Sequence, residues 1–368
     1  MSQPNPAVEN PQPLLTSVIE NTIRRFIPFN VIIELTYRCN LRCRHCYIPE
    51  ERRRRRDLSA EEVKSALDQL SEMGALYLTF TGGEILVRKD FFELAWHAKK
   101  KGFALKLFTN GTLIDEATAD RIAELRPFTV DISLYGARSE THDSVTNSPG
   151  SHEHALSALK LLADRGIRVN AKVPLMGINF PEYKQLIQQC RDMGAGIKID
   201  PSIAPMDDGC TAPLSLRINE DQLFRVFSDP EVCPRGHLPA PPSQLCEAGR
   251  NTMTIGPTGD VVPCLQLPLV AGNIRTQPLR EIWENSPVLQ RLRSLQQSDL
   301  HQCANCDLAK WCNRCPGLAY LEDGDYLGCS SRARQVASVR KKVAQAYWSA
   351  HGQNLDEQST ETRSFGAQ

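Results

Sequence analysis

The 368-residue chain has no long apolar stretch and no recognisable export signal. A membrane-spanning helix needs roughly 18 to 20 consecutive apolar residues, and no run in this sequence approaches that length. The N-terminal residues MSQPNPAVENPQPLL also lack the basic and apolar regions of a secretory signal peptide. These absences predict a cytoplasmic protein that does not associate with a membrane.

The sequence also has no excess charge of either sign. Lysine and arginine together number 43, aspartate and glutamate together number 43, and the formal net charge is zero. A protein that binds a polyanion normally presents a net positive field to it. The balance therefore predicts that the chain does not bind nucleic acid.

Cysteine, in contrast, is abundant, with 13 residues in the chain. Thiols stay free in a reducing cytoplasm, so a disulfide scaffold does not explain these cysteines. Because most of them cluster at short spacings, they indicate metal or redox chemistry instead.

Six short apolar or β-branched segments begin at residue 31, and each is followed by a segment with helical periodicity. Ser59, with Glu62 three residues later, gives the first helix a capping-box sequence. Six strand–helix units predict an α/β fold whose parallel sheet curves into a partial (β/α)6 TIM-like barrel, with its chemistry at the carboxyl ends of the strands. The expected strands are 31–36, 76–80, 104–108, 129–134, 167–173 and 197–200, and the expected helices are 59–73, 90–101, 115–126, 151–165, 181–194 and 219–228.

Composition divides the chain into five parts. Pro, Asn and Gln dominate the start, Pro-rich sequence follows the sixth unit, and the end is polar. The segment TMTIGPTGDVVPC (252–264) predicts a β-hairpin that turns at 256–259. We expect a flexible arm at 1–27, the barrel at 28–205, a linker at 206–240, a small cysteine-rich C-terminal domain at 241–347 and a disordered tail at 348–368.

Three cysteines follow the first expected strand at once, in TYRCNLRCRHCY (36–47), with the spacing C-x3-C-x2-C. A cubane [4Fe-4S] cluster has four irons, which cysteine thiolates normally hold. Three thiolates, from Cys39, Cys43 and Cys46, leave one iron open for a substrate or cofactor. The alternative is a structural zinc site that His45 completes as Cys3His.

The second expected strand runs into TGGE (81–84). Gly82 and Gly83 let the backbone approach a ligand closely, and Glu84 can accept a hydrogen bond from an amine. Together, the cysteine loop after the first strand and this motif after the second resemble the radical S-adenosylmethionine (SAM) superfamily over residues 30–200.

The resemblance implies a role for each of these residues. Cys39, Cys43 and Cys46 would hold a [4Fe-4S] cluster whose fourth iron chelates the amino and carboxylate groups of SAM. One electron from the cluster would then cleave SAM to a 5′-deoxyadenosyl radical, which abstracts a hydrogen atom inside an enclosed pocket. The remaining contacts would come from Gly82, Gly83 and Glu84 to the amino group, from His45 and Tyr47 near the adenine, and from Thr109, Asn110 and Ser133 at the same mouth, with Ser133 reaching the ribose or carboxylate.

Thr109 and Asn110 also have ordinary structural roles as an alternative. Thr109 would then be a helix-cap threonine, and Asn110 would be a turn asparagine.

A second cysteine set follows the barrel and includes C-x2-C-x5-C-x2-C. Zinc ribbons separate their cysteine pairs by roughly 15 to 20 residues, so a gap of five disfavours zinc. The layout resembles the SPASM domain, which carries auxiliary iron–sulfur clusters in radical SAM enzymes. The resemblance implies an outer cluster on Cys303, Cys306, Cys312 and Cys329 and an inner cluster on Cys246, Cys264 and Cys315.

The fourth ligand of the inner cluster is not evident from the sequence. Cys233 and Cys210 are candidates, and an iron left open to substrate is the third possibility. Cys190, in the fifth expected helix, is assigned to core packing.

Two further features have alternative explanations. The arginine run in ERRRRRDLS (51–59) is either a solvated face or a docking patch for an acidic peptide or an electron-donor protein. Asp207 and Asp208 are either turn residues or a general base that removes a proton after hydrogen abstraction.

The leading hypothesis is an oxidoreductase-type radical SAM enzyme that modifies or crosslinks a peptide or protein side chain in peptide natural-product maturation, because SPASM domains accompany mostly peptide-maturing members. Its expected partners are a separate leader-peptide-binding protein and an electron donor such as flavodoxin or ferredoxin. The alternatives are the same chemistry on a small cofactor precursor such as a tetrapyrrole, or on a sulfatase active-site residue. A zinc-binding interaction module is the remote alternative.

Overall fold

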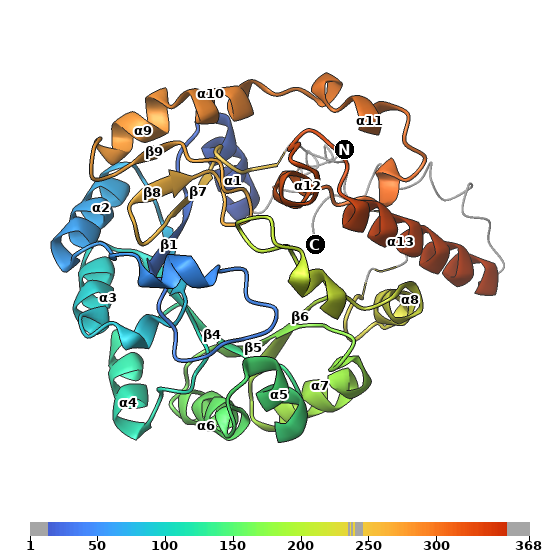
Figure 1. The fold of residues 1–368 in the computed structure, drawn as a ribbon, viewed down its shortest axis with the longest axis horizontal. Coiled ribbons are helices and arrows are strands. Elements are labelled where there is room, and N and C mark those ends of the chain that lie inside the picture. The colour runs from blue at the N-terminus through green and yellow to red at the C-terminus, as the bar shows by residue number, and fades with distance from the viewer. Residues whose placement is uncertain (1–13, 235, 237, 240–245, 352–368) are drawn as a thin grey trace, which may run out of the picture.

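The strands and helices that alternate along the chain form a curved parallel sheet with its helices on the outside (Figure 1). The computed structural model describes residues 14–234, 236, 238–239 and 246–351. All six predicted strand–helix units are present within them, which confirms the partial barrel. The strands are β1 (Asn30–Thr36), β2 (Tyr77–Gly82), β3 (Ala104–Thr109), β4 (Thr129–Ser133), β5 (Val169–Pro174) and β6 (Gly196–Asp200), and the predicted helices are α2 (Ala60–Glu72), α3 (Phe91–Lys100), α4 (Glu116–Leu125), α6 (Ser151–Asp164), α7 (Tyr183–Asp192) and α8 (Glu220–Ser228).

Each barrel strand buries one face against the helices and turns the other inward, because side chains alternate along a strand. In β3 the helix-facing residues Leu105 and Leu107 are buried, whereas Lys106 and Phe108 are half-buried on the inner face. At the start of α2 the predicted capping box between Ser59 and Glu62 is present in both directions. The inner faces of the strands therefore form the wall of any site inside the barrel.

The predicted hairpin extends the barrel sheet instead of forming a sheet of its own. Strand β7 (Thr252–Ile255) pairs in parallel with β1, β8 (Asp260–Val262) pairs antiparallel with β7, and β9 (Gly272–Asn273) completes the sheet. Among the described residues the strand order is β6-β5-β4-β3-β2-β1-β7-β8-β9. This pairing covers the edge of β1, which would otherwise leave its backbone groups unpaired.

Residues near the N-terminus contradict the expected flexible arm of residues 1–27. Leu14–Arg24 form helix α1, the Phe26 carbonyl accepts a hydrogen bond of 2.7 Å from Trp283 Nε1, and Asn251 Nδ2 donates to Thr22 Oγ1. The prediction is wrong for this part because the aliphatic residues of LLTSVIENTIR recur at helical spacing between the Pro-rich residues and the barrel. Residues 1–13 lie outside the described residues.

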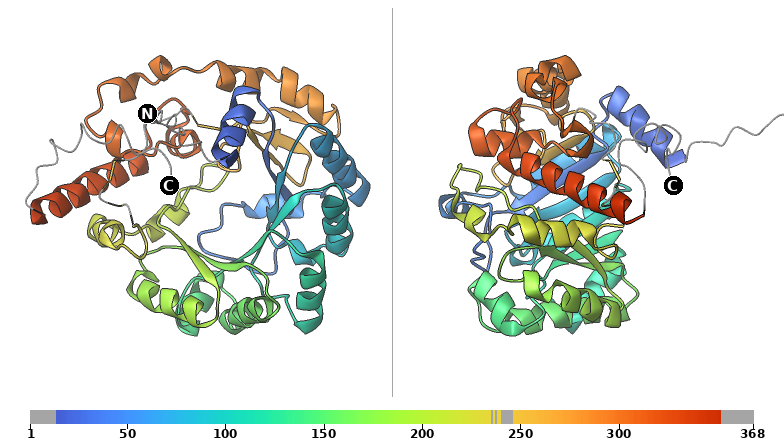
Figure 2. Two further views of the ribbon diagram at one scale, coloured as in Figure 1. Left: turned by 180° about the vertical axis from the view of Figure 1, so that it is seen from behind. Right: turned by 90° about the vertical axis from the view of Figure 1, so that its right-hand side faces the viewer.

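Helix α5 (Ser139–Thr146) and the helices of the C-terminal region complete the fold. Helix α5 and the last two helices were not predicted from the sequence. Figure 2 shows the red α13 beside the yellow α8, where Val339 and Val343 pack against Leu223. The C-terminal helices are α9 (Leu279–Asn285), α10 (Pro287–Ser294), α11 (His301–Ala304), α12 (Pro316–Asp323) and α13 (Ser331–Ala350).

The C-terminal helix extends past the start of the expected disordered tail. Helix α13 continues to Ala350, so disorder predicted from residue 348 is wrong at its start, and 352–368 lie outside the described residues. Every helix in the described part of the chain is too short or too polar to cross a membrane.

Candidate active site

A cavity of about 530 Å³ opens at the carboxyl ends of the barrel strands. Its wall also includes Leu265, Gln266 and Leu321 from the cysteine-rich region, so both halves of the chain enclose it. Of the predicted site residues around the barrel, all but Glu84 line it. These are Cys39, Cys43, His45, Cys46, Tyr47, Gly82, Gly83, Thr109, Asn110 and Ser133.

The loop with the three cysteines is held against α5 by backbone hydrogen bonds. Arg42 N donates to the Thr146 carbonyl at 3.1 Å, and Arg44 N donates to the Val145 carbonyl at 2.9 Å. Asn147 Nδ2 donates back to the Arg42 carbonyl at 2.7 Å. Helix α5 was not predicted, yet these bonds make it the support of the cysteine loop.

Burial makes the three thiols poor acids in the absence of a metal. It raises the pKa of Cys39 and of Cys46, and it raises the pKa of Cys43 to about 12. A protonated thiol does not bind iron, so the chemistry of the pocket favours thiolates only when a metal replaces their protons. Three thiols facing one cavity fit a cluster with one iron open.

His45 lies between the cluster cysteines and the aromatic side chain of Tyr135. The two ring centroids are 4.6 Å apart at an interplanar angle of 63°. Burial lowers the pKa of His45 to about 4, so its ring is neutral at pH 7. Its buried Nδ1 has no hydrogen-bond partner among the described residues, which fits a ligand that brings a polar edge to this wall.

The two glycines of the TGGE motif lie where the end of β2 meets the chain after β1. Gly83 N donates to the Thr36 carbonyl at 2.8 Å, and Glu84 N donates to the Arg38 carbonyl at 2.9 Å. A Cβ at Gly82 would overlap the Thr36 carbonyl oxygen, and a Cβ at Gly83 would overlap the Arg38 carbonyl oxygen. Gly82 also has a φ of +124°, which side chains disfavour. Both glycines are therefore required by the packing of the cysteine loop on the sheet.

Glu84 does not line the cavity, and its side chain is fully buried. Its carboxylate accepts hydrogen bonds of 2.7 Å from Thr109 Oγ1, 2.7 Å from Asn110 N and 3.0 Å from Leu86 N. Burial nevertheless raises its pKa. A carboxylate has about four acceptor sites, so these three bonds leave room for one more, and its contact with an amine stays a prediction.

The polar residues after β3 and β4 meet at the mouth as predicted. Asn110 Nδ2 donates to Asn40 Oδ1 at 2.9 Å, and Asn110 Oδ1 accepts from Thr112 N, so this residue also closes a turn. Thr109 is not a helix cap, because α4 begins after Asp115. Ser133 lines the cavity and hydrogen-bonds the Tyr135 hydroxyl.

Sequence reasoning missed several charged residues on the inner wall of the barrel. Lys198 Nζ lies 2.7 Å from Asp131 Oδ2, and Lys172 Nζ lies 3.9 Å from the ring centroid of Phe108. Lys172 forms no ion pair with the described residues, and burial lowers its pKa. Its position on the inward face of β5, at every second residue, was the available signal.

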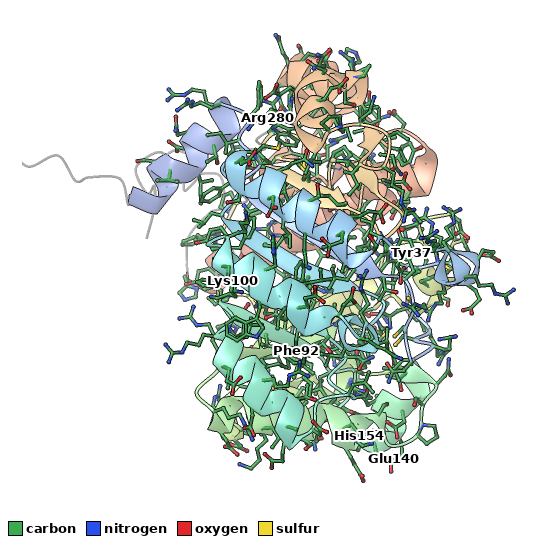
Figure 3. The ribbon with its side chains drawn as sticks, turned by 90° about the vertical axis from the view of Figure 1, so that its left-hand side faces the viewer. Tyr37, Phe92, Lys100, Glu140, His154 and Arg280 are labelled. Carbon is green, nitrogen blue, oxygen red and sulfur yellow. The ribbon has the colours of Figure 1, made fainter. Side chains whose placement is uncertain are left out.

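The arginine run is not a uniformly solvated face. Arg52 Nη1 lies 2.8 Å from Asp207 Oδ2, and its guanidinium lies over the ring of Tyr37, which Figure 3 labels beside this segment. Arg53 is buried, whereas Arg54–Arg56 are exposed. The prediction of one solvated face is wrong for the first two arginines, which turn inward.

Two buried carboxylates lie beneath this segment. Burial raises the pKa of Glu34, which accepts a 2.6 Å hydrogen bond from Tyr47, to about 7. Burial also raises the pKa of Asp207, which lines the cavity, to about 6. Asp208 accepts from Cys210 N as a turn residue does.

The second cysteine set contains two groups of neighbouring thiols. Burial raises the pKa of Cys246, and it raises the pKa of Cys264 to about 11. The negative charge of the neighbouring Cys315 raises both values further. Burial raises the pKa of Cys312 to about 11, and the negative charges of Cys329, Cys303 and Cys306 raise it further. Four cysteines therefore lie together in the outer group. Among the described residues, no three His, Cys, Asp or Glu side chains converge closely enough for one metal ion.

The two candidates for the fourth inner ligand lie in different surroundings. Burial lowers the pKa of Arg340, and the negative charges of Cys233 and of Cys312 in the outer group oppose this change. Cys210 is exposed. Gln266 Oε1 instead lies 3.4 Å from Cys315 Sγ, and Gln266 lines the cavity. Cys190 is fully buried in the main core, which confirms its assignment to packing.

Comparison with known proteins decides the family. Residues 33–190 match the Radical SAM superfamily, and residues 246–316 match SPASM, an iron-sulfur cluster-binding domain. The chain belongs to the radical SAM superfamily. As a radical SAM enzyme it binds SAM and a [4Fe-4S] cluster, and its SPASM domain carries auxiliary iron–sulfur clusters.

Three relatives are each 30% identical to this chain. AdoMet-dependent heme synthase of Methanosarcina barkeri matches over 334 residues, which are 80% of this chain and 93% of the relative. Mycofactocin maturase MftC of Mycobacterium tuberculosis matches over 79% of this chain and 80% of its own length. The subtilosin biosynthesis protein AlbA of Bacillus subtilis matches over 78% and 67%.

Solved structures share the fold at low sequence identity. Streptococcus suis SuiB bound to precursor peptide SuiA has a TM-score of 0.68 at 16% identity, over 90% of this chain and 84% of that chain. The enzyme anSMEcpe with bound AdoMet has a TM-score of 0.65 at 16% identity, over 87% and 97%.

Replacing Gly83 by Ala is expected to displace the cysteine loop of this radical SAM enzyme, because the new Cβ overlaps the Arg38 carbonyl oxygen. Overpacking of this kind costs about 1–3 kcal/mol. We expect a lower iron content after anaerobic reconstitution and a lower thermal midpoint. Gly177→Ala is the control, since nothing lies near its Cβ position. Equal iron content in both variants would contradict the packing role.

The buried Glu34 carboxyl predicts a pH dependence of stability. Its folded pKa of about 7 exceeds the value of 4.5 in the unfolded chain, so the unfolded state loses its proton first and stability falls as pH rises from 4.5 to 7. The difference corresponds to about 3 kcal/mol. Glu34→Gln keeps an acceptor for Tyr47 and should remove this fall, so that its thermal midpoint changes less than the parent's between pH 5 and pH 8. Exposed Glu61→Gln should behave as the parent does.

Proposed function

We propose that this radical SAM enzyme oxidatively modifies a peptide or protein side chain, with Cys39, Cys43 and Cys46 as the ligands of its SAM-binding cluster. When bound, the cluster and SAM supply a 5′-deoxyadenosyl radical that abstracts a hydrogen atom from the substrate. The single observation that carries the proposal is the composition of the cavity wall. Cluster-loop residues lie on one side of it, and Leu265 and Gln266, next to Cys264, lie on another.

This arrangement suits a reaction that ends in oxidation. A substrate radical must lose one electron to become a crosslink or an unsaturated product, and an inner cluster on Cys246, Cys264 and Cys315 would lie beside the same cavity. Asp207 has a raised pKa and faces the cavity, which supports its role as the base that takes the accompanying proton. Its ion pair with Arg52 favours the charged carboxylate, the form that can accept a proton.

A peptide substrate is supported by two of the relatives. MftC is named a maturase and AlbA a bacteriocin biosynthesis protein, and each resembles this chain across both domains. A leader-peptide-binding partner and a flavodoxin or ferredoxin as electron donor remain predictions that go with this function.

The second candidate is a small cofactor precursor such as a tetrapyrrole. The heme synthase of Methanosarcina barkeri is matched over 93% of its length, the widest coverage of the three relatives described. The unpaired Lys172 in the cavity also suits an acidic small molecule.

The test of function offers both substrate classes to the reconstituted enzyme. The protein is incubated anaerobically with SAM, a reductant and either short peptides encoded beside its gene or a tetrapyrrole precursor. We expect one peptide to lose two hydrogens, with 5′-deoxyadenosine formed in equal amount, as mass spectrometry would show. A mass change in the tetrapyrrole alone would reject the peptide in favour of the second candidate.

The ligand assignment has its own test in Cys43→Ala. Losing one of three thiolates should abolish SAM cleavage and lower the iron content by about four atoms per chain, the number in one cubane. The matched control is Cys190→Ala, which removes a buried core thiol. This variant should keep the parent's SAM cleavage and iron content. Reductive SAM cleavage at the parent's rate in Cys43→Ala would rule out this assignment.

A further inference from the structure

One arginine of the exposed run faces the cluster cysteines. The run begins in the short helix η1 (Glu50–Arg54), and the Arg53 side chain is only 7% exposed. Arg53 Nη1 donates to the Leu41 carbonyl at 3.0 Å, and Nη2 donates to Cys46 Sγ at 3.4 Å. Arg53 lines the cavity, so its charge lies inside the site.

Each of the other two cluster cysteines also meets one side-chain donor. Asn110 Nδ2 lies 3.7 Å from Cys39 Sγ, and the Tyr135 hydroxyl hydrogen-bonds the Cys43 side chain. The three donors come from different elements, namely the loops after β3 and β4 and helix η1. Arg53 is the charged one of the three, so its effect on the sulfurs should be the largest.

Hydrogen bonds and positive charge near a cluster favour its reduced state. One-electron reduction adds a negative charge, which a nearby guanidinium stabilises more than it stabilises the oxidised cluster. The interaction is strong because the site is buried and poorly screened. Glu50 lies 3.4 Å from Arg53 Nε, but its side chain is 53% exposed, so solvent screens its opposing charge.

We propose that Arg53 raises the reduction potential of the SAM-binding cluster and so sets how readily the electron donor reduces it. The inference rests on the proposed assignment of Cys39, Cys43 and Cys46 to that cluster. Arg53 acts through Cys46 and is therefore a positioning residue. The hydrogen bond to Leu41 also ties it to the loop, so the test must separate charge from structure.

The measurement is an anaerobic redox titration of the reconstituted enzyme, followed by electron paramagnetic resonance. The signal that changes when SAM is added identifies the SAM-binding cluster among the three. In Arg53→Gln, which keeps a donor and loses the charge, we expect the ratio of reduced to oxidised cluster at a fixed potential to fall about tenfold. A tenfold change corresponds to about 59 mV for one electron.

Two variants separate the effect of the Arg53 charge from a structural effect on the loop. Arg53→Lys keeps the charge and should stay close to the parent, and Arg54→Gln removes the same charge from the exposed neighbour and should do so as well. Tyr135→Phe should shift the potential in the same direction by less, since it removes an uncharged donor.

The outcomes that overturn the proposal are distinct. An unchanged potential in Arg53→Gln with full iron content would overturn it, and so would an equal fall in Arg53→Lys or Arg54→Gln. If Arg53→Gln does not take up iron, the reduction potentials of Arg53→Lys and Tyr135→Phe decide. A larger fall in the potential of Arg53→Lys than in that of Tyr135→Phe would overturn the role of the arginine charge. A parent enzyme with no SAM-responsive signal would instead reject the proposed ligand assignment.

Discussion

The site depends on the close approach of two backbones, one at Gly82 and Gly83 and the other at Thr36 and Arg38. Two interstrand hydrogen bonds hold them together, and no side chain fits between them. The contact fixes the start of the cysteine loop to the sheet, while α5 fixes its middle. The three thiols therefore face the cavity as part of a rigid wall. A radical reaction needs such a wall, because any gap would admit water or a competing hydrogen donor.

The second constraint is that one sheet passes from the barrel into the SPASM domain. Because β7 pairs with β1, the hairpin that ends at Cys264 is registered against the strand that precedes Cys39. The two cluster regions are thus held at fixed positions by a ladder of backbone hydrogen bonds. A substrate in the cavity would lie between the source of the radical and an acceptor for its electron.

Local sequence patterns predicted those parts of the fold that local forces decide. Short apolar or β-branched segments located all six barrel strands, and the Ser59–Glu62 capping box located the start of α2. Tertiary contacts decide the rest. No local pattern tells which arginine of a run turns inward, since the partners that hold Arg53 are a carbonyl and a thiol in the folded cysteine loop. Nor does any local pattern show that Glu84 accepts hydrogen bonds from Thr109 and Asn110, which lie at the end of the next strand.

Everything proposed for this site requires that three thiolates hold a cluster at the mouth of the barrel and leave one iron for SAM. Mössbauer spectroscopy of enzyme reconstituted with isotopically enriched iron tests it most directly. On addition of SAM, one iron of one cluster should change its isomer shift while the other irons of that cluster keep theirs. If SAM changes no iron, or if the loop proves to hold zinc, the claim is contradicted.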